Sequence, residues 1–209
     1  MAPPRKHDTD RILDAARAIV LHQGPRAASV ATIARESGAP TGTLYHRFGN
    51  RDRILSAAWV RALERFQSRA LEAGDVEDPV DAGVAMTESV IGFAREYRDD
   101  ARLLLTLRPD DLLDADPDSD LRARIRAINR PLEAQLRRVA AGIYGDADAR
   151  ALDAVTRAIV DLPYGAIRRH ARGRARMPTW LEPDVTSQAR ALLMAGGSDR
   201  PGSPKRRSR

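Results

Sequence analysis

The chain has 209 residues, of which 43% are hydrophobic and 31% charged, so it can bury a sizeable core as one large or two small folded domains. Its formal net charge of +6 is compatible with a nucleic acid or an anionic membrane as partner. The absence of cysteine excludes disulfides and thiolate chemistry, and no apolar run approaches the roughly 20 residues needed to span a bilayer. Residues 1–10 are charged and lack the apolar stretch of a secretory signal, so we expect a cytoplasmic protein.

Apolar residues recur at helical spacing almost everywhere, and β-branched and aromatic residues are sparse, so we predict an all-α fold. The first third of the chain is predicted to form helices at 8–22, 29–37, 40–48 and 51–73. Gly24 and Gly38 are placed to end the first two helices. Ser29 and Asn50 are suited to cap the second and the fourth, and Pro40 to open the third, where its missing N–H costs nothing.

The rest of the chain is predicted to bring the total to about nine helices, with further ones at 79–97, 101–107, 121–143, 147–172 and 184–195. Residues 109–120 include six Asp and no basic residue, which predicts a solvated connector on the surface. Pro131 and Pro163 lie inside predicted helices and should kink or break them. The Gly/Ser/Pro/Arg-rich end of the chain, 196–209, is predicted to be disordered.

The segment 29–55 is the most informative part of the sequence, and it reads SVATIARESGAPTGTLYHRFGNRDRIL. Two short helices joined by a tight, glycine-containing turn form a helix-turn-helix. A helix that enters a DNA groove needs small polar side chains on its outer edge, and Thr41, Gly42 and Thr43 supply them. Leu44 and Phe48 are four residues apart, so they can anchor the opposite face to the core.

This segment resembles the tetracycline-repressor (TetR) family of bacterial regulators. The resemblance lies in residues 39–55, APTGTLYHRFGNRDRIL, placed near the N-terminus after one helix and before a helical remainder of the expected length. The segment departs from the family pattern at two positions: Pro40 stands where serine is usual, which puts the turn into the recognition helix in doubt, and Arg51 stands where lysine is usual, which keeps the charge.

The resemblance implies a set of DNA contacts: Thr41, Gly42, Thr43, Tyr45, His46, Arg47 and Arg51. Arg47 is the candidate for direct readout, because arginine can bind guanine through two hydrogen bonds. Arg51 would meet a phosphate together with the first amides of the fourth helix. Other interpretations stay open: Tyr45 as an aromatic at the edge of the core, His46 as a solvated side chain, and Arg51 with Arg53 as an ordinary charged face.

The charge distribution supports a DNA-facing N-terminal end, because residues 1–55 carry nine Lys and Arg against five Asp and Glu. An arm with Arg5, Lys6 and Arg11 could touch phosphates or the minor groove, or be merely flexible. The basic C-terminal end could add non-specific affinity for DNA or serve solubility; it contains Lys205, Arg206, Arg207 and Arg209.

One short recognition helix reads few base pairs, so two copies related by a two-fold axis are expected to read a palindromic operator in double-stranded DNA. The resemblance implies a homodimer formed by helices 147–172 and 184–195, and a cavity for a small-molecule effector. Candidate cavity residues, chosen by position and type, are Trp59, Phe66, Met86, Phe93, Tyr97, Leu104, Asp161 and Tyr164; each could equally belong to the core or the surface. Asp161 and Tyr164 flank Pro163, where freed carbonyls could help to orient a ligand.

We therefore expect a helix-turn-helix DNA-binding domain at 1–52 with a flexible arm at 1–7, a helical ligand-binding and dimerisation domain at 53–196, and a disordered basic tail at 197–209. The expected function is a bacterial repressor that a small molecule releases from its operator, found with the nucleoid when bound. A regulator of the same fold that activates, or that has no ligand, is the alternative.

An enzyme is not expected. The sequence has no Walker or dinucleotide motif, no HExxH and no nucleophile elbow. No metal or cofactor is expected either, because the four histidines are isolated from acids at ligand spacing. A role at a membrane surface would explain the charge but not the helix-turn-helix.

Overall fold

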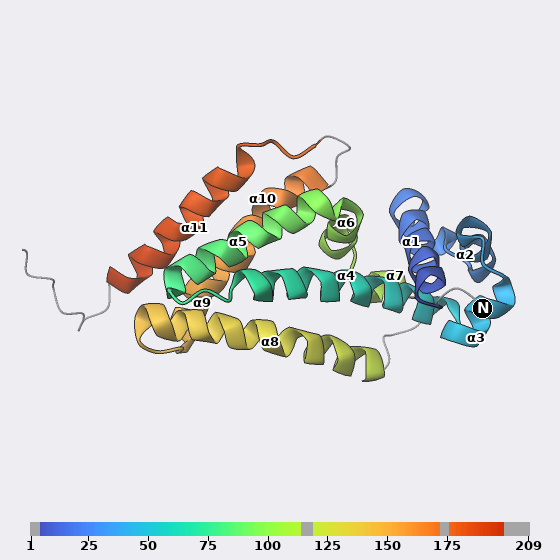
Figure 1. Ribbon diagram of the computed structural model, residues 1–209, viewed down its shortest axis with the longest axis horizontal. Coiled ribbons are helices and arrows are strands. Elements are labelled where there is room, and N and C mark those ends of the chain that lie inside the picture. Colours follow the sequence, from blue (N-terminus) through green and yellow to red (C-terminus); the bar gives the residue numbers. More distant parts are fainter. Residues whose placement is uncertain (1–4, 114–118, 172–175, 199–209) are drawn as a thin grey trace, which may run out of the picture. The chain divides into compact units, whose positions relative to one another are not determined.

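A computed structural model describes residues 5–113, 119–171 and 176–198 of the chain (Figure 1). These residues are helical almost throughout and include no β-strand, so the predicted all-α fold class is confirmed. The α-helices are α1 (Arg5–Gln23), α2 (Val30–Ser37), α3 (Thr41–Phe48), α4 (Arg51–Ala73), α5 (Pro79–Glu96), α6 (Arg98–Thr106), α7 (Pro109–Leu112), α8 (Ser119–Tyr144), α9 (Ala149–Thr156), α10 (Leu162–Ala171) and α11 (Leu181–Ser198). None of these helices has both the length and the apolar character to cross a membrane.

The chain divides into two compact units, which do not follow the order of the sequence. The first unit is Met1–Phe66 with Tyr97–Ile128, and the second is Gln67–Glu96 with Asn129–Arg209. These units are defined by contacts within the chain. The boundary predicted after residue 52 instead divides a DNA-binding domain from a ligand-binding and dimerisation domain, and it stays a prediction.

Local capping signals set the ends of the helices that form the helix-turn-helix. The Ser29 hydroxyl accepts a hydrogen bond from the Thr32 amide at 3.1 Å, which caps α2 as predicted. Gly38 ends α2 in the left-handed region, at φ +69°, which favours glycine. The Asn50 side chain accepts from the Arg53 amide at 2.9 Å and caps α4. Pro40 lies one position before α3 rather than inside it, because its ψ of 138° is extended.

The cap of α2 gives a stability test. Ser29→Ala is expected to lower the free energy of unfolding by about 1 kcal/mol, because it leaves an amide of the first turn without its acceptor. Ser29→Asp keeps an acceptor at this position and should leave the stability close to that of the parent. Urea unfolding followed by circular dichroism measures both variants, and equal losses in the two would contradict a capping role.

The core of the first unit is centred on α1. Side chains of α1, α2, α3, α4 and α6 pack together in it; α2 lies beside α1 in Figure 1, and α3 contacts α2. Its most deeply buried members are Ile12, Ala16, Ile33, Leu44, Ile54, Leu55 and Leu103. Leu44 is fully buried, so the recognition helix is fixed to the core through one face.

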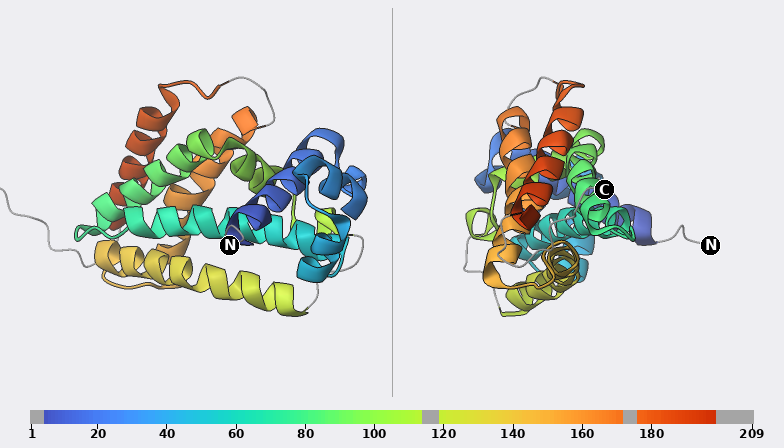
Figure 2. Two further views of the ribbon diagram at one scale, coloured as in Figure 1. Left: turned by 45° about the vertical axis from the view of Figure 1, so that its right-hand side comes forward. Right: turned by 90° about the vertical axis from the view of Figure 1, so that its left-hand side faces the viewer.

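The second unit is built on close contact between α5 and α11, which run side by side in both views of Figure 2. Gly83 of α5 permits this approach, because a Cβ at this position would lie 2.8 Å from Cδ1 of Leu193 and 3.2 Å from Cδ1 of Ile159. Gly83 and Leu193 are buried, as are Val139 of α8 and Val155 of α9.

The structure corrects three expectations for the second half of the chain. The predicted connector 109–120 begins with a short helix, α7, in which the Asp111 carboxylate accepts from the Arg108 amide; residues 114–118 lie outside the described residues. Of the kink or break expected at Pro131, the break does not occur, because α8 continues through this residue. The predicted helix 147–172 is α9 and α10 joined by a π-helical turn, Arg157–Asp161. Pro163 has no N–H for the regular i→i−4 bond, and the wider turn before it accommodates that loss.

Two predictions for the chain ends fall partly outside the described residues. Residues 1–4 of the predicted arm and residues 199–209 of the predicted tail are not described, and the second group includes Lys205, Arg206, Arg207 and Arg209. Within the described part, α1 already begins at Arg5 and α11 continues to Ser198.

Candidate nucleic-acid interface

The recognition helix α3 presents one edge to solvent. Thr41, Gly42, Tyr45 and His46 are exposed, and 54% of the Tyr45 surface is accessible, whereas Leu44 of the same helix is fully buried. Tyr45 therefore lies on the surface and not at the edge of the core. Thr43 is half-buried. Thr41 and Gly42 form a small, uncharged part of this edge, which suits close approach to a nucleic-acid groove, and Tyr45 and His46 lie one turn further along the helix.

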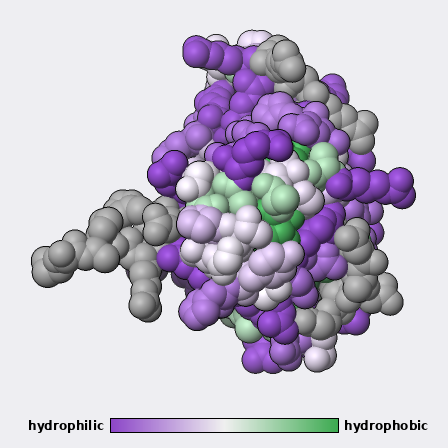
Figure 3. Space-filling model, turned by 90° about the vertical axis from the view of Figure 1, so that its right-hand side faces the viewer, coloured by the Kyte–Doolittle hydropathy of each residue, from purple (hydrophilic) through white to green (hydrophobic). Residues whose placement is uncertain are grey.

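Figure 3 shows the face of the molecule on the side of α1, α2 and α3. Residues of intermediate or apolar hydropathy gather in the middle of this face, and hydrophilic side chains surround them. A weakly polar centre with a hydrophilic rim suits a groove in the centre and phosphates at the rim. The same unit exposes Ala31 of α2, Gly42 of α3, and the cations Arg26 and Arg53.

Gly42 is not required by the fold. A Cβ at this position would meet no atom within 4 Å, and its φ is not positive. Gly38, by contrast, needs its positive φ to end α2. The fold gives no reason for a glycine at position 42. The missing side chain would instead allow a partner to approach the backbone of α3 closely.

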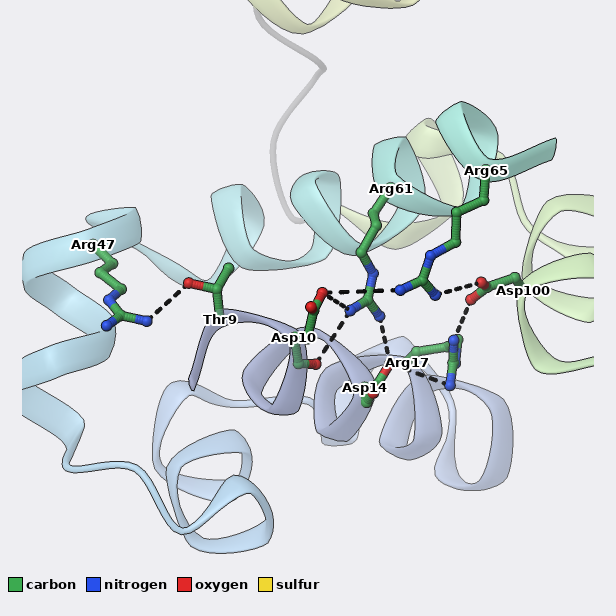
Figure 4. A network of polar contacts seen from close by, with 8 residues as sticks. All are labelled: Thr9, Asp10, Asp14, Arg17, Arg47, Arg61, Arg65 and Asp100. Atoms are coloured by element: carbon green, nitrogen blue, oxygen red, sulfur yellow. Dashed lines mark hydrogen bonds and ion pairs between the residues drawn. The ribbon is translucent and has the colours of Figure 1, made fainter. Parts of the chain in front are cut away.

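Arg47 is half-buried in the last turn of α3, and its Nη1 donates to the Thr9 hydroxyl of α1 at 2.8 Å. Figure 4 shows the side chain directed from α3 toward Thr9. This contact ties the end of the recognition helix to the start of α1. Arg47 would have to exchange this partner, or use its remaining donors, to reach a base.

Arg51 has a structural role that the sequence did not reveal. Its Nε donates to the Ala28 carbonyl at 3.1 Å, its Nη2 to the Pro25 carbonyl at 2.7 Å, and its Nη1 to Asp52 at 2.6 Å. These bonds attach the 3₁₀ turn Pro25–Ala27, which precedes α2, to the start of α4. Three donors are thus engaged inside the protein before any phosphate contact.

The comparisons with known proteins agree with this geometry. Residues 12–58, which include α2, α3 and the start of α4, match the family model described as bacterial regulatory proteins, tetR family. This segment is therefore similar to the N-terminal region of the tetR family. The solved structures named below are described as transcriptional regulators.

Solved structures with a similar fold match nearly the whole chain. A TetR-like regulator from Rhodococcus sp. RHA1 has 17% identity and a TM-score of 0.68, covering 95% of this chain and 100% of its own. PfmR of Thermus thermophilus has 25% identity and a TM-score of 0.61, covering 88% and 97%. FadR of Bacillus subtilis, solved with stearoyl-CoA, has 18% identity and a TM-score of 0.59, covering 90% and 97%. No curated protein matches the chain.

Near the candidate interface, the cations that are exposed to solvent are different from Arg51. Arg26 of the 3₁₀ turn and Arg53 in the first turn of α4 are exposed, and neither forms an ion pair with another described residue. From the sequence, a phosphate contact is predicted for Arg51, and Arg53 is considered only as part of an ordinary charged face. The Asn50 cap places Arg53 at an exposed helix N-terminus, and this is the signal that could have indicated it.

The candidate ligand residues are divided between the two units. In the first unit, Trp59 donates its indole N–H to the Leu107 carbonyl at 3.1 Å, and the unit also contains Phe66, Tyr97 and Leu104. In the second unit, Met86 and Phe93 of α5 are buried, whereas Asp161 and Tyr164 are exposed. Asp161 and Tyr164 are thus not buried beside Met86 and Phe93. Among the described residues, no group of three or more His, Asp or Glu is placed to hold a metal ion.

Proposed function

We propose that this protein is a homodimeric transcriptional repressor of the tetR family that binds a palindromic operator through α3 and leaves it when a small molecule binds. The observation that carries the proposal is the exposed, small-residue edge of α3, fixed to the core by the fully buried Leu44 on its other face. Thr41, Gly42 and Thr43 are proposed to enter the major groove, and Tyr45 and His46 to contact the backbone or base edges.

Two helices of the second unit support a homodimer. Val160 and Tyr164 are one helical turn apart, and they are 37% and 41% exposed; Leu192 and Met194 of α11 are 46% and 58% exposed. Val160 lies in the π-helical turn Arg157–Asp161 and Tyr164 in α10, and both elements contact α11. Large apolar side chains left in water on two adjacent helices are typical of a surface that a second copy covers.

The proposed effector binds the second unit, where Met86 and Phe93 contribute buried apolar surface. FadR of Bacillus subtilis was solved with stearoyl-CoA, and its fold is similar to that of this chain. A long-chain acyl-CoA is therefore a reasoned first compound to test for release from DNA. Release requires that the compound favour the conformation that cannot span both half-sites.

Selection of bound duplexes from a random DNA pool, at a stated salt concentration, tests the proposal. A palindrome is expected. Arg47→Ala should relax the preference at one position of each half-site, because a base contact specifies sequence. Arg53→Ala should weaken all sequences alike and lower the salt slope by about one, because a phosphate contact does not read bases.

Arg51→Ala is a poorer test of a phosphate contact, because it also leaves the carbonyls of Pro25 and Ala28 without their donor. If the selection returned no sequence with two half-sites, the proposed palindromic operator would be contradicted. Unchanged base preference in Arg47→Ala would remove Arg47 from the reading role and leave the rest of the proposal intact.

A further inference from the structure

One carboxylate of the first unit is buried without belonging to the proposed interface. Asp100 of α6 is only 1% exposed. It accepts a hydrogen bond from Arg17 of α1 and another from Arg65 of α4, the latter at 2.9 Å (Figure 4). A buried carboxylate is costly unless charged donors satisfy it. Asp100 therefore joins three helices at one point.

A second set of ion pairs joins α1 to α4 directly. Arg61 of α4 donates to the carboxylate of Asp10 at 2.8 Å and to that of Asp14 at 2.5 Å. Asp14 also pairs with Arg17 at 3.3 Å, so the two sets form one network (Figure 4). The Arg61 side chain is only 12% exposed, whereas the side chains of Asp10 and Asp14 are 43% and 49% exposed, so these pairs lie at the edge of the buried part of the network.

The positive charge of Arg65 is stabilised by the carboxylates around it. Burial would lower the pKa of Arg65, but the hydrogen bond and negative charge of Asp100, with the charges of Asp10 and Asp14, raise that pKa above its usual value. The guanidinium therefore stays charged at any pH at which the protein is folded.

The network reaches the recognition helix through α1. Thr9, which holds Arg47 of α3, directly precedes Asp10, which Arg61 holds (Figure 4). In the chain, α6 follows α5 after a single residue, Tyr97. Asp100 thus lies on the helix that continues the chain from α5, and it contacts both α4 and α1, the helix to which Arg47 attaches the end of α3.

A purely stabilising role does not account well for this arrangement. Apolar residues of similar volume usually stabilise a protein at least as well as a buried ion pair does. Ion pairs differ from apolar contacts in being directional, so they can fix the rotation and register of one helix against another.

We propose that Asp100 is a positioning residue for DNA reading: it fixes α1 against α4 and so sets the angle at which α3 meets the half-site. The role rests on the proposed function. Loss of the charge leaves the helices packed by their apolar core but free to rotate slightly, so the reading helix accepts several half-site positions instead of one.

The test compares Asp100→Asn with Leu103→Ala. Leu103 lies on the same helix, is 1% exposed and belongs to the apolar core, so its truncation destabilises the unit without touching the network. Each variant is titrated with operator duplexes whose half-sites are moved together or apart by one base pair. The parent should discriminate between spacings by roughly tenfold or more. Asp100→Asn should discriminate by less than about threefold, while Leu103→Ala keeps the parental discrimination.

The outcomes separate the two proposals. A parent protein that binds no paired site refutes the proposed function, and the positioning role with it. A parent that discriminates together with an Asp100→Asn variant that discriminates equally well overturns the positioning role alone. If Asp100→Asn does not fold, Arg65→Gln replaces it, because the Arg65 side chain is 35% exposed and Arg17 still pairs with Asp100. Arg65→Gln should weaken the discrimination in the same direction, and an unchanged value would equally overturn the role.

Discussion

Leu192→Glu is expected to convert the protein from a dimer to a monomer and to lower its affinity for a paired operator by about 100-fold or more. Leu192 of α11 is 46% exposed in a single chain, so glutamate at this position should not disturb folding. In a dimer the same side chain would be covered, and a carboxylate there would be buried without a partner. Tyr164→Glu on α10, where Tyr164 is 41% exposed, should have the same effect from the neighbouring helix.

Sedimentation measures the oligomeric state, and titration with one-site and two-site duplexes measures the affinity. Only the affinity for the two-site duplex should fall, because a monomer keeps its reading helix but loses the link between the two half-sites. Ala134→Glu is the matched control. Ala134 is exposed on α8 of the same unit, so it adds the same charge outside the proposed surface on α10 and α11. A Leu192→Glu protein that remains a dimer would show that α11 does not form the interface through this face.

The helix-turn-helix could be predicted closely because its boundaries depend on local chemistry. The Ser29 cap, the positive φ of Gly38 and the Asn50 cap each act within a few residues, so the sequence pattern contains the whole cause. The predicted range of α4, Arg51 to Ala73, agrees with the structure to the residue.

Roles that depend on tertiary partners could not be predicted in the same way. Arg51 is one more arginine in the sequence, and only the fold brings it to the carbonyls of Pro25 and Ala28. Asp100 follows another aspartate in an exposed-looking helix start, yet its donors lie 83 and 35 residues away. The same limit applies to the ligand residues, because residue size and helical position do not tell a buried Phe93 from an exposed Tyr164.

Gly42→Glu is expected to abolish operator binding while leaving the fold intact. The site has open space for a side chain, and an acidic residue in the first turn of a helix is favourable by roughly 0.3–1 kcal/mol. In the proposed complex the same carboxylate would face the bases and the phosphates, so we expect at least about a 100-fold loss of affinity. Gly42→Ala should raise the free energy of unfolding by about 1 kcal/mol, since alanine is the better helix former.

Two controls separate charge and backbone effects from the loss of a DNA contact. Gln23→Glu adds the same charge at an exposed position of α1 in the same unit and should change the affinity only slightly. Gly38→Ala should lose about 1 kcal/mol of stability, because alanine resists the positive φ that ends α2. Thermal unfolding and a titration of the selected operator measure all four variants. If Gly42→Glu still bound the operator as tightly as the parent, the exposed edge of α3 could not be the surface that meets DNA.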